Sequence, residues 1–153
     1  MRAVDQLQTN FQDNGVEVVL RSIPYHVTSS LPDNIAGICV YQENGRPVGI
    51  AINRRVLNDW MIESATHYGF LYKALLHEIG HCFFGRDHDD GHLEISLDLF
   101  TENSMDLSVM ISGGLARTPK VLWPYYVKEI AGLDRINTQD DLMRFLRDSH
   151  VLD

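Results

Sequence analysis

The segment "ALLHEIGHCFFGRDHDDGH" (residues 74–92) contains four of the seven histidines of the chain. Apolar residues inside this segment and before it recur at spacings of three and four, which predicts a helix over about residues 61–84 with one buried face. The residues of this face are Tyr68, Tyr72, Leu75, Leu76, Ile79 and Phe83. Gly85 follows the last of them, where a helix commonly ends in a left-handed glycine.

His77, Glu78 and His81 form an H-E-x-x-H motif on this predicted helix. Residues four apart share a helix face, so the two histidines can bind one metal ion. Zinc favours imidazole nitrogens, and a nearby carboxylate such as Glu78 can accept a proton from a water that the metal activates. Burying such a patch is costly unless something satisfies it, so the motif predicts a metal site on a buried helix.

A third protein ligand is needed if the fourth position of the metal is to hold water. We prefer His88, because a helix that ends at Gly85 lets the chain turn back toward the metal. Asp87 is the immediate rival and His92 is a further candidate. Glu94 begins "EISLD" (94–98), an E-x-x-x-D pattern in which a second helix donates a glutamate, although few residues separate it from His81.

The stretch "HEIGHCFFGRDH" (77–88) resembles the zinc-binding motif of the metzincin endopeptidases, H-E-x-x-H-x-x-G-x-x-H. Gly85 and His88 each stand one residue later than in that motif, and Asp87 occupies the usual position of the third ligand. The segment also resembles small bacterial and phage zinc peptidases that have an HE-x-GHC start and an R-x-H finish. The resemblance covers roughly residues 16–115.

Two further features are implied by the resemblance. One is a Met-turn, a methionine in a tight turn beneath the metal, for which we prefer Met110 of "DLSVMISGG" (106–114) to Met105 of "ENSM" (102–105). The other is a sheet edge that lies along the cleft, antiparallel to the bound substrate. Either "PVGIAINRR" (47–55) or its partner "GICVYQ" (37–42) is expected to supply that edge.

The resemblance implies a zinc-dependent endopeptidase with one zinc ion on His77, His81 and His88. Glu78 would act as general base and pass the proton of the attacking water to the leaving amine. A zinc-binding module without proteolysis is the alternative, and it would close its zinc with a fourth protein ligand such as His92 or Asp87. A gluzincin-type peptidase that uses Glu94 is another.

Outside this segment the pattern predicts an α+β fold: a small mixed sheet with a hairpin packed on the long helix, and C-terminal helices. The resemblance adds the Met-turn to this fold. The hairpin is expected around Asn44-Gly45, as a two-residue type I′ turn. We also expect a helix over residues 4–12, a strand over 16–23 and mainly loop over 21–34. Helices are expected over 119–133, with Pro124 in the first turn, and over 137–150, with a capping box formed by Thr138 and Asp141.

The chain is expected to form a single domain, residues 1–153, with a sheet part over about 1–85 and an irregular and helical part over 86–153. Its net charge of −8, without a basic stripe, makes nucleic acid or an anionic membrane a poor partner. The resemblance implies a peptide or protein substrate, and a monomer is expected. Cys39 and Cys82 are interpreted as small buried residues, with one disulfide between them as the alternative.

The start of the chain, "MRAVDQLQTNFQDNG" (1–15), has no apolar stretch of the kind found in signal peptides. A cytoplasmic or phage-associated product is therefore favoured. A domain excised from a longer secreted precursor is the alternative.

Overall fold

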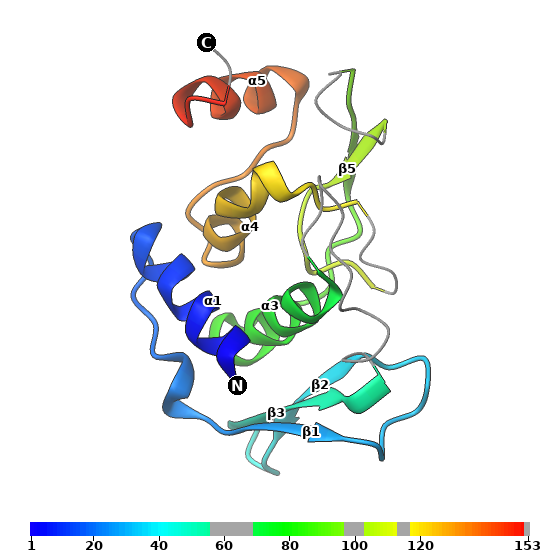
Figure 1. The fold of residues 1–153 in the computed structure, drawn as a ribbon. Helices are drawn as coiled ribbons and strands as arrows, with labels where there is room; N and C mark the ends of the chain where they lie inside the picture. Colours follow the sequence, from blue (N-terminus) through cyan, green and yellow to red (C-terminus); the bar gives the residue numbers. More distant parts are fainter. Residues whose placement is uncertain (56–68, 97–102, 113–116, 152–153) are drawn as a thin grey trace.

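Helix α3 (Phe70–Phe84) lies between a three-stranded sheet and α4, with α1 beside it (Figure 1). The computed structural model describes residues 1–55, 69–96, 103–112 and 117–151. Its other elements are α1 (Arg2–Asp13), a 3-10 helix (Leu20–Ser22), β1 (Tyr25–Thr28), β2 (Gly37–Tyr41), β3 (Pro47–Asn53), β4 (His92–Glu94), β5 (Ser104–Asp106), a second 3-10 helix (Lys120–Leu122), α4 (Trp123–Ile130) and α5 (Gln139–Asp148). The predicted α+β class is confirmed at this level.

The end of α3 and its buried face agree with the sequence analysis. Gly85 has a left-handed backbone (φ 61°, ψ 26°), a conformation that costs glycine little energy because it has no Cβ. Leu75, Leu76 and Ile79 are fully buried and belong to a core that also includes residues of α1, α4 and α5. The part of the predicted helix before residue 69 lies outside the described residues.

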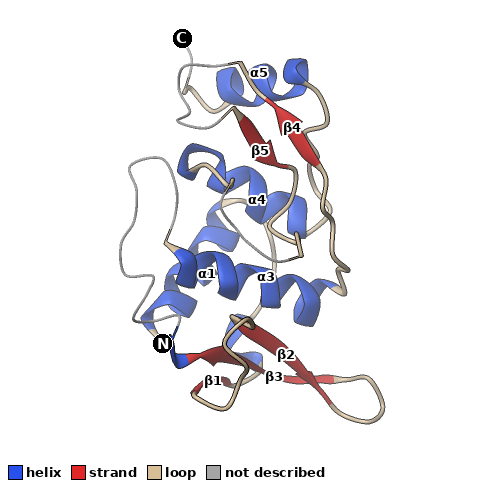
Figure 2. Ribbon diagram, turned by 90° about the vertical axis from the view of Figure 1, so that its right-hand side faces the viewer, coloured by secondary structure: helices blue, strands red, loops and turns tan. Residues whose placement is uncertain are grey.

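The three-stranded sheet has the order β1-β3-β2, so β3 is its central strand. β1 runs parallel to β3, and β2 pairs antiparallel with β3 to form the predicted hairpin. β4 and β5 form a separate antiparallel pair near α5, at the other end of the molecule (Figure 2). One face of β2 is partly open to solvent, because Ile38 and Val40 are 37% and 38% exposed.

The expected type I′ turn of the hairpin is wrong. The Gly45 N–H donates to the Gln42 carbonyl and the Gln42 N–H donates to the Arg46 carbonyl, both at 2.9 Å. Only Gly45 has a positive φ, 81°, whereas Asn44 does not. A three-residue loop places the left-handed requirement on one residue, which here is the glycine, whereas a type I′ turn places it on two.

The strand expected over residues 16–23 is also wrong, because a side chain takes the place of a partner strand. The Gln8 amide donates to the Val18 carbonyl and accepts from the Leu20 N–H, both at 2.8 Å. Val16 and Leu20 are buried, which explains the strand-like alternation. The region expected to be mainly loop contains β1, a four-residue strand that pairs with the central strand.

The C-terminal helices follow their sequence signals. Pro124 lies in the first turn of α4. The Asp141 N–H donates to Thr138 Oγ1 at 3.1 Å, and the Thr138 N–H donates to Asp141 Oδ2 at 3.2 Å, which completes the predicted capping box of α5. Tyr125 and Tyr126 are fully buried, and their hydroxyls donate to carbonyls of residues 106 and 107.

The two cysteines form a disulfide, so their interpretation as ordinary small buried residues is wrong. Cys39 of β2 and Cys82 of α3 have their Cα atoms 5.7 Å apart, which suits this bond. The bond links β2, an edge strand of the sheet, to the helix that carries the H-E-x-x-H motif. The sequence did not show that these two positions face each other, because they lie 43 residues apart.

Candidate metal centre

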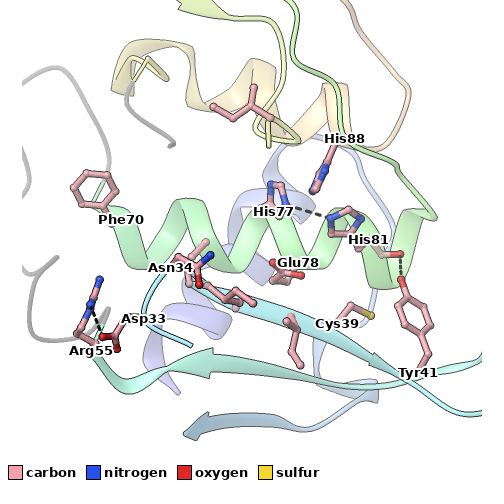
Figure 3. Close-up of a pocket in the computed structure, with 16 residues that line it drawn as sticks. Asp33, Asn34, Cys39, Tyr41, Arg55, Phe70, His77, Glu78, His81 and His88 are labelled. Atoms are coloured by element: carbon pink, nitrogen blue, oxygen red, sulfur yellow. Dashed lines mark hydrogen bonds and ion pairs between the residues drawn. The ribbon is translucent and has the colours of Figure 1, made fainter. Parts of the chain in front are cut away.

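His77, His81 and His88 lie together, with one ring nitrogen of each within 4.8 Å of the others. His77 and His81 project from neighbouring turns of α3, and His88 comes from the loop that follows Gly85. Figure 3 shows the three rings pointing toward one another at the edge of a cavity. The structure therefore brings together the three residues that the sequence analysis preferred as metal ligands.

The hydrogen bonds of the two helix histidines fix which nitrogen carries the proton. Nδ1 of His77 lies 2.7 Å from the Val109 carbonyl, and Nδ1 of His81 lies 2.6 Å from the Arg86 carbonyl. A carbonyl only accepts, so each Nδ1 is the donor and each neutral ring presents a bare Nε2. Burial lowers the pKa of His77 to about 4, which keeps that ring neutral.

These bare nitrogens face each other, with the Nε2 atoms of His77 and His81 3.2 Å apart. When both rings are neutral, two lone pairs at this distance repel, whereas a proton or a metal cation between them would be bound by both. Nitrogens about 2.0–2.1 Å from a tetrahedral zinc are separated by about 3.3 Å, close to the separation seen here. The donor set thus fits zinc, with His88 close enough to supply a third nitrogen.

The rival ligands are not part of this cluster. Among the described residues, no His, Cys, Asp or Glu other than the three histidines joins the group. His92 Nε2 lies 3.4 Å from Glu94 Oε1, and both side chains are exposed. Glu94 lies on a strand, β4, rather than on the second helix that a gluzincin-type site would need.

The choice between His88 and Asp87 gives a first prediction. His88→Ala removes one of three nitrogens and is expected to lower zinc affinity by at least about 100-fold, since loss of a direct ligand costs more than the 10–100-fold typical of losing a residue that supports a ligand. Asp87→Ala, at an exposed neighbouring position, is expected to change it less than about threefold. Chelator competition measures both affinities. A larger loss for Asp87→Ala would assign the third ligand to Asp87.

Glu78 lies beside the histidines and is 7% exposed. Burial raises its pKa to about 7, although a hydrogen bond from the backbone N–H of Cys39 acts in the opposite direction. In Figure 3 the carboxylate lies between α3 and β2. Gly37 permits this approach, because a Cβ at that position would lie 3.2 Å from Glu78 Cγ.

Met110 lies in a turn packed under α3, directly after the residue whose carbonyl holds His77. Its side chain is fully buried, and a Cβ added at Gly80 would overlap its Sδ. Met105, the second choice of the sequence analysis, is buried in β5 opposite Leu93. The structure thus places Met110, rather than Met105, in a turn beneath the histidines.

The contact between Gly80 and Met110 gives a second prediction. Gly80→Ala is expected to lower the free energy of unfolding by about 1 kcal/mol, because overpacking of 1–3 kcal/mol outweighs the helix propensity gained. In a Met110→Ala background the same change is expected to stabilise the protein by up to about 1 kcal/mol. Chemical denaturation of the four proteins measures this reversal of sign. Equal effects in both backgrounds would show that the contact does not restrict residue 80.

The histidines and Glu78 line a cavity of about 700 Å³. One wall is α3 and another is β2, which pairs only with β3 among the described strands. Of the two strands expected to supply an open edge, "PVGIAINRR" is excluded, because β3 is the central strand. The partner strand, "GICVYQ", has the edge beside the cavity. The hydroxyl of Tyr41, in this strand, donates to the His81 carbonyl at 3.2 Å.

Sequence reasoning missed Arg86, whose carbonyl holds His81. The only signal was its place between Gly85 and His88, because the carbonyls to which its side chain donates hydrogen bonds lie more than 40 positions later. None of the helices in the described ranges has the length and apolar character needed to cross a membrane. Comparisons with family models, curated protein sequences and solved structures find no match.

Proposed function

We propose that the protein is a zinc-dependent endopeptidase that hydrolyses peptide bonds with Glu78 as general base. The observation that carries the proposal is the pair of bare Nε2 atoms 3.2 Å apart, with His88 beside them. Such a pair is unfavourable unless a proton or a metal cation lies between the two nitrogens. Three protein ligands also leave one position of a tetrahedral ion for water or substrate, as in catalytic zinc sites.

A zinc ion held by His77, His81 and His88 would polarise the scissile carbonyl and acidify the attacking water. The chain's own groups then have separate tasks. The carbonyls of Val109 and Arg86 keep the bare nitrogens of His77 and His81 directed at the site. Glu78 would accept the proton of the water and deliver it to the leaving amine.

The geometry of β2 supports a peptide or protein as substrate. The N–H of Cys39 is directed toward Glu78, so the edge of β2 that pairs with no other described strand faces the base. An extended peptide can add to such an edge through backbone hydrogen bonds, which would place its scissile bond near the histidines. This binding mode requires no particular side chain at most substrate positions.

A zinc-binding module without proteolysis is the second candidate. It would be favoured by a fourth protein ligand, and within the described residues none joins the three histidines. The buried Glu78 also has no evident task in a purely structural site.

The test is to purify the protein without chelator, measure bound zinc per chain and assay cleavage of a quenched casein substrate. We expect about one zinc per chain, and cleavage that is lost on chelation and restored by added zinc. Zinc binding without cleavage of a broad peptide panel would favour the non-proteolytic module. Absence of zinc binding would contradict the proposal.

A further inference from the structure

The loop that carries His88 has no regular structure between Gly85 and β4, yet charged side chains on both sides of His88 are held by the C-terminal part of the molecule. Arg86 precedes His88 by two residues and Asp89 follows it directly. Both side chains contact groups at or just after the end of α4. The position of the third histidine therefore depends on contacts outside the metal-binding segment itself.

Arg86 contacts His81 through its backbone and the end of α4 through its side chain. Its carbonyl accepts from Nδ1 of His81 at 2.6 Å. Its guanidinium lies 2.7 Å from Glu129 Oε2 and donates to the carbonyls of Glu129, at 2.7 Å, and Ile130, at 3.2 Å. A positive charge is favourable at these carbonyls, because they are at the C-terminal end of α4.

Asp89 holds the other side of His88. Arg135 Nη1 lies 2.7 Å from Asp89 Oδ2 and 3.8 Å from Glu129 Oε2, and the Asp89 N–H donates to the Met110 carbonyl at 2.8 Å. Arg86 Nη2 also lies 3.9 Å from Asp89 Oδ2. These four side chains, Arg86, Asp89, Glu129 and Arg135, form a cluster with no net charge.

Glu129 is the buried member of this cluster, and its charge requires both arginines to stay in place. Glu129 is 2% exposed, so water does not reach its carboxylate. The negative charge of this carboxylate is balanced by Arg86 and Arg135. Arg86 contacts the Glu129 carboxylate and the two helix carbonyls through Nη1, and it faces Asp89 through Nη2. The single ammonium of lysine lacks this second nitrogen, so it cannot contact both carboxylates with the same geometry. Moving the start of the loop would break these contacts together.

We propose that Arg86, paired with buried Glu129, is the positioning residue of the metal centre. It fixes the orientation of His81 through its carbonyl and the start of the His88 loop through its side chain. The inference rests on the zinc site of the proposed function and does not depend on peptide cleavage. Partners of ligating histidines affect metal affinity because they set ring orientation before the metal binds.

The test measures zinc affinity by chelator competition, and the visible absorption of the cobalt(II)-substituted protein, for wild type and Arg86→Met. A double variant, Arg86→Met/Glu129→Gln, removes the charge that the single change would leave buried and unpaired. Arg117→Met is the matched control, because Arg117 Nε also lies near a buried carboxylate, 3.6 Å from Asp106 Oδ1. Arg86→Lys tests whether charge alone suffices. Thermal unfolding of the metal-free proteins reports stability separately.

We expect Arg86→Met to lower zinc affinity by about 10–100-fold and to alter the cobalt spectrum, with Arg117→Met within about threefold of wild type. The double variant should recover stability but not zinc affinity, and Arg86→Lys should fall between Arg86→Met and wild type. Affinity that returns with stability in the double variant, or an unchanged affinity in Arg86→Met, would overturn the inference. Wild-type protein that binds no zinc would overturn the proposed function as well, which separates the two failures.

Discussion

Glu78→Gln is expected to bind zinc like the wild-type protein and to cleave peptides about 10²–10⁴-fold more slowly. Glutamine keeps the size of the side chain and can still contact the Cys39 N–H through its amide oxygen. It cannot accept a proton at neutral pH, so the step assigned to Glu78 is lost. Zinc content, kcat and kcat/KM on one fluorogenic peptide measure the two effects separately.

Glu94→Gln is the matched control for this experiment. It makes the same chemical change at an exposed residue of β4, outside the histidine cluster, and is expected to leave cleavage and zinc content unchanged. If Glu94→Gln removes cleavage while Glu78→Gln does not, the general base is misassigned and the gluzincin-type alternative gains support. Loss of zinc in Glu78→Gln would instead indicate a structural role for Glu78.

The parts of the site that the sequence predicted depend on short-range geometry. The spacing of His77 and His81 on a helix, the left-handed end at Gly85 and the return of the chain to His88 all follow from neighbouring residues. The capping box of Thr138 with Asp141 is local in the same sense. Such features have a physical cause within one or two helical turns, so one sequence is enough to reveal them.

The features that the sequence did not reveal depend on contacts between distant segments. Gln8 binds the backbone of the segment expected to be a strand, and no local pattern distinguishes that side chain from a partner strand. The contact of Arg86 with Glu129 likewise depends on where α4 ends relative to Gly85. Asn44 and Gly45 predicted the hairpin but not its turn type, because both two- and three-residue loops accept glycine.

Removal of the disulfide is expected to have the largest effect on stability. The bond between Cys39 and Cys82 spans a separation of 43 residues, and chain entropy assigns such a cross-link about 4 kcal/mol of unfolding free energy. The loss should appear as a lower denaturant midpoint for Cys39→Ala/Cys82→Ala than for oxidised wild type. All three histidines of the cluster lie on α3 or after it, so any zinc that they hold is expected to persist at low denaturant.

The single variants make this prediction sharper, because either change alone breaks the bond. Cys39→Ala and Cys82→Ala should each lose nearly the full amount, the double variant should lose little more, and wild type with a reductant should unfold at a similar midpoint. Losses that simply add would point to packing of the two side chains instead.

The disulfide also joins the strand whose Cys39 N–H reaches Glu78 to the helix that carries Glu78. Cleavage should therefore fall in the double variant while zinc is retained, because the edge of β2 is no longer fastened beside the base.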